Sequence, residues 1–142
     1  MQIQTEIIIN ASAQRVWDIL TDFENYQNWN PFIVHSQGKA VAGQKLQNTM
    51  RLNGKDQVFK PTLLKVEPIR YVEWLGSLFF KGLFDGRHFF ELVPIDENQV
   101  KLIHGESFGG VFKRLIMSQV GDETRENFIK MNQALKQEAE KK

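Results

Sequence analysis

Two histidines and one glutamate form the acid–base cluster that this sequence predicts: His88, His104 and Glu106. His88 lies in an alternating segment over residues 83–93, and the other two lie in a second alternating segment over residues 99–108. Adjoining segments of this kind are typical of an antiparallel hairpin, in which every second side chain points to the same face. We therefore expect the three groups to share one face of a hairpin.

The register of this hairpin depends on the centre of its turn. A turn centred on Glu97 gives three pairs: His88 with Glu106, Phe90 with His104, and Leu92 with Leu102. A turn centred on Asp96 pairs His88 with His104 and keeps the same faces together, whereas an odd register places His88 against Gly105. We favour the first register because it keeps the apolar residues together.

Four interpretations of the cluster remain open. A buried His–Glu hydrogen bond would satisfy both partners and order the sheet. The same groups would alternatively fix the polar end of an otherwise apolar ligand, or act in acid–base catalysis, since histidine titrates near neutral pH and a carboxylate can orient it. Two histidines and a carboxylate also form the ligand set of a facial-triad metal site. We predict no metal here, because strand spacing alone does not establish that geometry.

A long amphipathic helix from Gly110 to Glu140 must cover this face. Its apolar side chains recur along one stripe: Phe112, Ile116, Val120, Phe128, Met131 and Leu135. A helix of this length needs a broad partner surface, and the rest of the chain reads mainly as strands. Gly121 is unfavourable inside a helix, so two alternatives stay open: a continuous helix, or a kink or break at Gly121-Asp122.

The remaining segments predict an α+β order of one strand, two short helices, a run of strands and the long helix. The first strand spans residues 2–10, a helix capped by Asn10 or Ser12 spans 13–21, and a short aromatic segment spans 22–29. Further strands are expected over residues 32–41, 46–52, 56–67 and 70–75. Asn53-Gly54 predicts a hairpin, Pro61 an edge or a bulge, and residues 76–82 a loop.

Composition limits the function classes. The 142 residues suit one domain, 1–142, and 18 basic against 17 acidic residues give a net charge of +1, so we expect no nucleic-acid partner. The absence of cysteine excludes disulfides, thiol catalysis and thiolate metal sites. The only apolar run near the start, Ile7-Ile8-Ile9, is too short for a signal peptide or a membrane span. We therefore expect a cytoplasmic protein without stable membrane insertion.

Phenylalanine dominates the aromatic residues, with 11 Phe against 3 Trp and 2 Tyr. A Phe-rich interior presents bulky apolar surfaces with few hydrogen-bond donors. These rings either fill a packed core or line an apolar cavity.

Four groups of residues resemble the SRPBCC superfamily, also called START-like or Bet v 1-like, and within it the polyketide cyclase/dehydrase-like branch. The first comprises Val16-Trp17, Leu20, Asp22, Tyr26 and Trp29-Asn30-Pro31-Phe32. The second is Gly82-Leu83-Phe84 with Gly86, His88, Phe90 and Leu92, and the third is His104, Glu106, Phe108 and Gly110. The fourth, at the end of the long helix, is Asn132, Leu135-Lys136 and Glu140.

This resemblance implies a helix-grip fold: a curved antiparallel sheet of six or seven strands around the C-terminal helix, with two short helices after the first strand. It also implies a deep cavity between sheet and helix, commonly used for lipids, sterols, polyketides or other apolar molecules. Our candidate ligand-binding residues are Trp74, His88, Phe90, Leu92, His104, Glu106, Phe108, Phe112, Ile116 and Val120.

Three functions follow as hypotheses. We favour binding of a small hydrophobic molecule, without a cofactor, by a carrier or sensor-like protein. The first alternative is a cyclase- or dehydratase-type enzyme that uses His88, Glu106 and His104 as acid–base groups. The second is a protein-interaction module that binds a partner through the open sheet face or the loop over residues 79–84. This loop would form a mobile lid, contact a membrane transiently or plug one end of the cavity.

Overall fold

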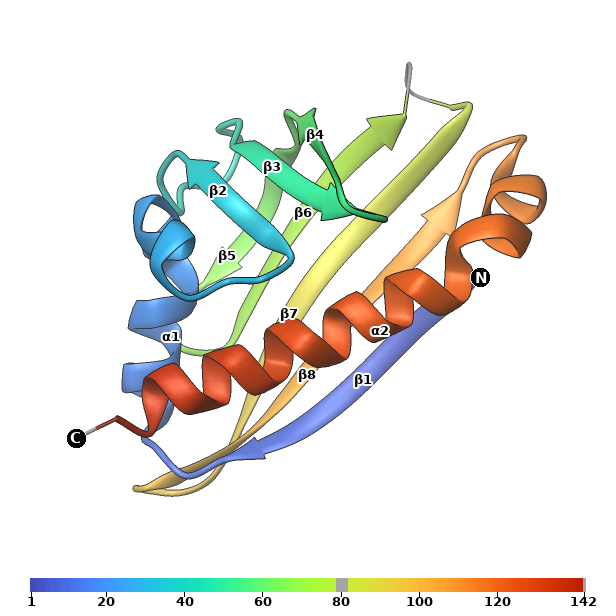
Figure 1. Ribbon diagram of the computed structural model, residues 1–142. Helices are drawn as coiled ribbons and strands as arrows, with labels where there is room; N and C mark the ends of the chain where they lie inside the picture. Colours follow the sequence, from blue (N-terminus) through green and yellow to red (C-terminus); the bar gives the residue numbers. More distant parts are fainter. Residues whose placement is uncertain (79–81, 142) are drawn as a thin grey trace.

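The computed structural model describes residues 1–78 and 82–141, and over these residues the chain has the predicted α+β order (Figure 1). The strands are β1 (Gln2–Ile9), β2 (Ile33–Gln37), β3 (Gln47–Leu52), β4 (Lys55–Phe59), β5 (Thr62–Glu67), β6 (Tyr71–Leu78), β7 (Phe84–Asp96) and β8 (Gln99–Gly109). The helices are α1 (Ala13–Thr21), the 3-10 helix η1 (Phe23–Asn28) and α2 (Lys113–Ala139). Residues 79–81, which belong to the loop predicted as a lid, a membrane contact or a plug, lie outside the described residues.

The strands form two antiparallel sheets instead of one. The larger has the order β1-β8-β7-β6-β5, and the smaller has the order β2-β3-β4. The expected single strand over residues 56–67 is divided at Lys60-Pro61 into β4 and β5, which lie in different sheets. Proline has no N–H for a strand ladder, and the carbonyl of Pro61 instead accepts a hydrogen bond from the amide of Leu46. The described residues therefore form eight strands, more than the six or seven expected.

Two further strand boundaries differ from the prediction. β2 ends at Gln37 instead of continuing to residue 41, because Gly38 has φ +132°, a conformation unsuited to a strand. β6 continues through residues 76–78, where a loop was expected, because Gly76 pairs with Gly86 of β7. The Asn53-Gly54 hairpin is confirmed: both residues have positive φ, and β3 and β4 pair on either side of them.

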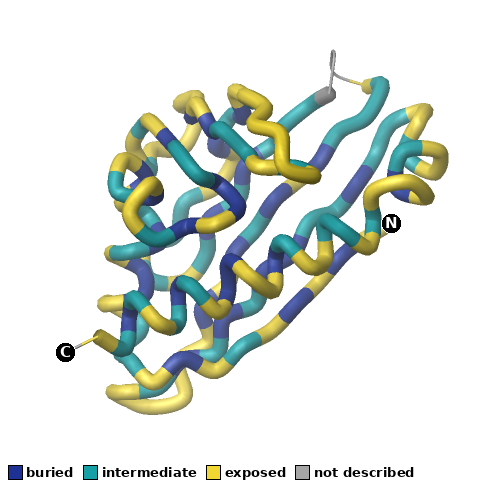
Figure 2. Tube along the Cα trace, in the orientation of Figure 1, coloured by how far each residue is buried: buried dark blue, intermediate teal, exposed yellow. Residues whose placement is uncertain are grey.

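Helix α2 lies across β1, β8 and β7 of the large sheet, which is the helix-grip arrangement (Figure 1). Phe128, Met131 and Leu135 of the predicted stripe are fully buried. The predicted stripe is only partly buried at its beginning, where Phe112 is 48% and Val120 37% exposed. The first half of α2 lines a cavity. Figure 2 shows most of this part of the helix as intermediate or exposed.

Gly121 does not break the long helix, because α2 runs without interruption from Lys113 to Ala139. A Cβ atom at this position would meet only Met117 Cε, at an ordinary contact distance of 3.5 Å. We therefore expect Gly121→Ala to raise the free energy of unfolding by about 0.5–1 kcal/mol, since alanine restricts the unfolded chain and suits a helix. Urea unfolding measures this gain. A loss of stability would show that the glycine is needed for packing.

The two short helices predicted after the first strand are α1 and η1, and α1 lies beside the C-terminal end of α2 at one end of the molecule (Figure 1). Ser12 is the N-cap of α1, and its hydroxyl accepts a hydrogen bond from the Arg15 amide at 3.1 Å. Val16 and Leu20 of α1 are fully buried. The C-terminal end of α2 is anchored to the same region, since Arg15 donates to the carbonyl of Ala139. The opposite end of the molecule, beside the start of α2, therefore has fewer elements to cover its interior.

Candidate functional site

The hairpin of β7 and β8 has the register centred on Glu97. His88 pairs with Glu106, Phe90 with His104, and Leu92 with Leu102. The favoured register is therefore confirmed, and all three acid–base groups lie on the face of the sheet that α2 covers. Apolar side chains on the same face set this outcome, because a shift of one residue would turn them toward water.

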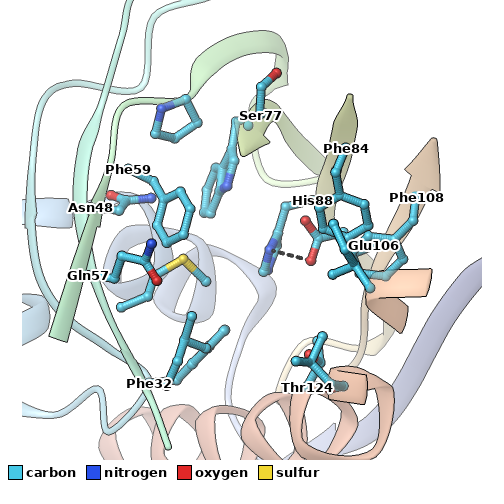
Figure 3. A pocket seen from close by; sticks show the side chains of 18 of the residues that line it. Phe32, Asn48, Gln57, Phe59, Ser77, Phe84, His88, Glu106, Phe108 and Thr124 are labelled. Carbon is cyan, nitrogen blue, oxygen red and sulfur yellow. Dashed lines mark hydrogen bonds and ion pairs between the residues drawn. The ribbon is translucent and has the colours of Figure 1, made fainter. Parts of the chain in front are cut away.

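A cavity of about 250 Å³ lies between the large sheet, the small sheet and the first half of α2. Six of the ten predicted ligand-binding residues line it: Trp74, His88, Glu106, Phe108, Ile116 and Val120. Figure 3 shows His88 and Glu106 side by side on one wall, facing Phe59 and Gln57 across the space. The lining is mostly apolar, and the acid–base pair provides a polar group on the sheet side.

The other four predicted residues do not line this cavity. Phe90, Leu92 and His104 are buried more deeply in the core, beyond His88 as seen from the cavity, because they lie further along the hairpin toward α1. Phe112 precedes the first residue of α2 as its N-cap and points largely to solvent. Periodicity identified the correct face of each element, but it does not show where along that face the packing opens.

The sequence prediction missed an entire wall of the cavity. The small sheet contributes Asn48, Met50, Leu52, Gln57 and Phe59, and Phe32 lies immediately before it. The alternation of Asn48, Met50 and Leu52 marks one face of β3, so the sequence contains a local signal. Nothing local shows that this face is turned toward Trp74 and α2, since that depends on the break at Pro61.

A chain of buried side chains extends from the cavity into the core. His88 Nε2 lies 2.7 Å from His104 Nε2, and His104 Nδ1 lies 2.7 Å from Asn132 Oδ1 of α2. Asn132 Nδ2 donates to Thr5 Oγ1 of β1 at 2.8 Å, and Thr5 Oγ1 donates to the backbone carbonyl of His104 at 2.9 Å. Asn132 and Thr5 were not predicted as site residues, because each is a single polar residue on the otherwise apolar face of its element.

Aromatic rings hold the two imidazoles in place. His104 lies between Phe90 and Phe128, each with its ring centre 4.2 Å from that of His104. His88 stacks on Trp74 at 5.0 Å, with an angle of 22° between the ring planes. These rings exclude water from the histidines, so the hydrogen bonds that they make act in a low-dielectric environment.

Burial keeps all three acid–base groups uncharged near neutral pH. It lowers the pKa of His104 to about 3, although the hydrogen bond to Asn132 opposes this shift. Burial, with the neighbouring His104, lowers the pKa of His88 well below its usual value. Burial raises the pKa of Glu106 to about 8. The cavity wall thus carries a protonated carboxyl beside an unprotonated imidazole.

His88 and Glu106 approach each other without a direct hydrogen bond. Nδ1 of His88 lies 3.6 Å from Oε1 of Glu106, which is beyond hydrogen-bond distance. The side chain of His88 is 1% exposed and that of Glu106 16%, so both are available only from the cavity. Within residues 1–78 and 82–141, no group of three His, Cys, Asp or Glu side chains is arranged to hold a metal ion.

The family model described as "Polyketide cyclase / dehydrase and lipid transport" matches residues 1–140. The chain belongs to this family. Membership in the polyketide cyclase/dehydrase and lipid transport family agrees with the SRPBCC resemblance found in the sequence. The family match and the solved structures together confirm the SRPBCC-type fold of the chain.

Solved structures with the same fold share little sequence with this family member. A START superfamily protein from Mycobacterium smegmatis is 18% identical, with a TM-score of 0.75, and the match covers 98% of this chain and 97% of that one. The Zhui aromatase/cyclase from Streptomyces sp. R1128 is 14% identical, with a TM-score of 0.78 and coverage of 99% and 93%. The protein TTHA0849 from Thermus thermophilus is 14% identical, with a TM-score of 0.76 and coverage of 98% and 97%. At these identities the likeness establishes the fold alone.

No curated protein matches the chain. In the part of the family member that the structure describes, no helix is both long and apolar enough to cross a membrane.

A glycine positions the carboxyl group in this family member. Gly86 lies on β7 beside Glu106, and a Cβ atom built there would lie 2.1 Å from Oε2 and 2.9 Å from Cδ of Glu106. We expect Gly86→Ala to lower the free energy of unfolding by no more than about 1 kcal/mol, since the methyl group displaces only the end of the flexible Glu106 side chain, which borders the cavity. Urea unfolding measures the loss.

A double-mutant cycle tests this assignment. In a Glu106→Ala background the added methyl group has room, so the cost of Gly86→Ala should largely disappear. Gly109→Ala is the matched control, because a Cβ atom there meets nothing within 4 Å. Equal costs of Gly86→Ala with and without Glu106 would contradict the predicted competition.

Proposed function

We propose that this protein binds a small lipophilic molecule in the cavity between the two sheets and the first half of α2. The observation that carries the proposal is the cavity itself, which is mostly apolar and has one buried acid–base pair in its wall. Ligand pockets typically combine an apolar lining with a few polar groups that orient the ligand.

The size of the cavity limits the ligand. Its volume of about 250 Å³ lies just below the range of roughly 300–1,000 Å³ usual for small-molecule sites. A ligand of one or two rings, or a short acyl chain, suits this volume.

Native mass spectrometry of protein purified gently from its own host tests the proposal directly. A discrete added mass that disappears on denaturation is the expected result, and it would identify the molecule. A wild-type crystal structure with side chains filling the interior and no cavity beyond a few waters would overturn the proposal.

A cavity-filling variant provides a second test. Met117 is buried and lines the cavity from α2, so Met117→Trp places a larger side chain in the ligand space. We expect the affinity for the uncharged fluorescent two-ring probe 1-aminonaphthalene to fall at least about tenfold, the equivalent of 1.4 kcal/mol. Fluorescence titration measures the change. Leu115→Trp is the control, because Leu115 is 60% exposed on the same helix. Equal affinities of the two variants would contradict this location.

Acid–base catalysis on a transient substrate is a second candidate function. The observation that favours it is the protonated Glu106 beside the unprotonated His88, which would serve as acid and base toward one bound molecule. A substrate found by screening should lose turnover in Glu106→Gln and in His88→Ala. Unchanged rates in both variants would exclude these roles.

A further inference from the structure

The chain of hydrogen bonds behind His88 ends on a group that can only accept. The backbone carbonyl of His104 accepts the hydrogen bond from Thr5 Oγ1 at 2.9 Å. The single hydroxyl proton of Thr5 is thereby used, so toward Asn132 this oxygen can only accept. Asn132 must therefore present its NH2 group to Thr5, and its carbonyl oxygen to His104.

This orientation of the amide determines the tautomers of both histidines. Nδ1 of His104 faces the carbonyl oxygen of Asn132, so it carries the proton. A neutral imidazole has one proton, which leaves Nε2 of His104 as an acceptor. Nε2 of His88, 2.7 Å away, then carries the proton of His88 and donates it to His104. The remaining nitrogen, Nδ1 of His88, is an acceptor on the side of the cavity.

We infer that Thr5, Asn132 and His104 are positioning residues that hold Nδ1 of His88 as a hydrogen-bond acceptor, so that the site selects an uncharged apolar ligand carrying a hydroxyl group. The inference rests on the proposed binding function and names the chemical class of its ligand. The hydroxyl group donates to His88 Nδ1 and accepts from the carboxyl group of Glu106.

The gap between His88 and Glu106 fits this role. At 3.6 Å, Nδ1 of His88 and Oε1 of Glu106 do not hydrogen-bond to each other, and no other side chain among the described residues donates to that nitrogen. A hydroxyl group both donates and accepts, so it matches both sides. An ether or ketone oxygen only accepts, and it would leave the buried nitrogen without a donor, which weakens binding.

The charge of the lining also restricts the ligand. No lysine or arginine is among the described residues that line the cavity, so a ligand carboxylate or phosphate would have no cationic partner. The other titratable lining residue, Glu123, accepts a hydrogen bond from the backbone amide of Asn53. Burying an unpaired charge in such a site is costly. An uncharged alcohol or phenol meets no such penalty.

Three probes of nearly equal size test the selection. 2-Naphthol both donates and accepts, 2-methoxynaphthalene only accepts, and 2-methylnaphthalene does neither. We expect wild-type protein to bind 2-naphthol about tenfold more tightly than either of the others, the size of one buried hydrogen bond. Calorimetric titration at pH 7, where all three probes are uncharged, measures the dissociation constants.

The histidine tautomers provide a second measurement. If the hydrogen bonds from Thr5 to His88 only stabilised the fold, a change of tautomer would not alter the preference for a hydroxyl-bearing ligand. Nitrogen-15 spectra of the histidine side chains should show Nδ1–H for His104 and Nε2–H for His88. Thr5→Val keeps the shape of the side chain but removes its hydroxyl, so Asn132 is free to adopt either orientation. We expect mixed tautomers in this variant and a preference for 2-naphthol reduced to about twofold or less. Thr5→Ser keeps the hydroxyl and should retain both properties.

The outcomes separate this inference from the binding function on which it rests. Equal affinity for the three probes overturns hydroxyl selection while leaving cavity binding intact. If none of the three probes binds, both hydroxyl selection and cavity binding are overturned for ligands of naphthalene size. A wild-type spectrum with Nδ1–H on His88 overturns the assignment of the acceptor, whether or not Thr5→Val folds.

Discussion

Replacing Phe128 with alanine should lower the free energy of unfolding by about 3–5 kcal/mol. Phe128 is fully buried on α2, and its ring stacks on His104 and contacts His88 and Phe32. The Phe128 side chain thus connects α2 to both strands of the hairpin and to Phe32, the residue immediately before β2. Its removal leaves a cavity among rings that cannot easily collapse. Urea unfolding at constant pH measures the loss.

The control for this variant lies one residue away. Ile129 follows Phe128 on α2, about 100° around the helix, and is 42% exposed, so Ile129→Ala should change the free energy of unfolding by no more than about 0.5 kcal/mol. The contrast between the two substitutions separates packing against the hairpin from any general effect on the helix. A loss below about 1 kcal/mol for Phe128→Ala would show that the helix does not depend on this contact.

The second large effect is a loss of stability with rising pH that depends on Glu106. Its pKa is about 8 in the folded protein and 4.5 in the ordinary case. Above pH 4.5 the unfolded chain loses this proton while the folded protein keeps it, so the unfolded state is favoured increasingly until about pH 8. Each unit of pKa difference corresponds to about 1.4 kcal/mol.

Glu106→Gln should remove this dependence, because glutamine does not ionise. The measurement is the difference in urea-unfolding free energy between wild type and Glu106→Gln at several values from pH 4.5 to 8. We expect wild type to lose stability relative to the variant as the pH rises. A constant difference over this range would show that Glu106 ionises normally in the folded protein.

The histidines act in the opposite direction at lower pH. Below their ordinary pKa of 6.5, His88 and His104 gain protons in the unfolded chain but remain neutral when folded, so stability falls as the pH falls. For His104 this loss continues until about pH 3. Stability therefore falls below pH 6.5 because of the two histidines and falls toward pH 8 because of Glu106. The three groups together oppose folding least near pH 6.5. A neutral acceptor and a neutral donor at the cavity wall follow from the same burial.

Local pattern was sufficient for much of the fold. Alternation in residues 83–93 and 99–108 predicted β7 and β8, and the apolar residues opposite one another predicted their register, because a slip would expose them. The spacing of Phe128, Met131 and Leu135 predicted the buried face of α2. The resemblance to the SRPBCC superfamily predicted the helix-grip arrangement. These features depend on residues that are close in sequence or on a single pairing.

Several local signals failed where tertiary contacts decided the result. Gly121 remained inside a continuous helix, because packing over 27 residues outweighs a cost of about 1 kcal/mol. The strand expected over residues 56–67 was divided between two sheets, since Pro61 provides no N–H and the chain bends there. Phe112 and Val120 fit the helical stripe but are partly exposed, because Phe112 precedes the helix as its N-cap and Val120 lines the cavity instead of packed side chains.

The sequence by itself determined that His104 and Glu106 share one face of a strand, since side-chain direction alternates along a strand. It favoured the same face for His88, because that register keeps the apolar residues of the hairpin together. Only the tertiary structure placed His88 and Glu106 in the cavity wall and His104 in the core. It also brought Thr5, 99 residues before His104, and Asn132, 28 residues after it, into one hydrogen-bonded chain. The physical reason is that burial and hydrogen-bond direction depend on which elements pack together. Periodicity describes one element at a time, so it cannot contain that information.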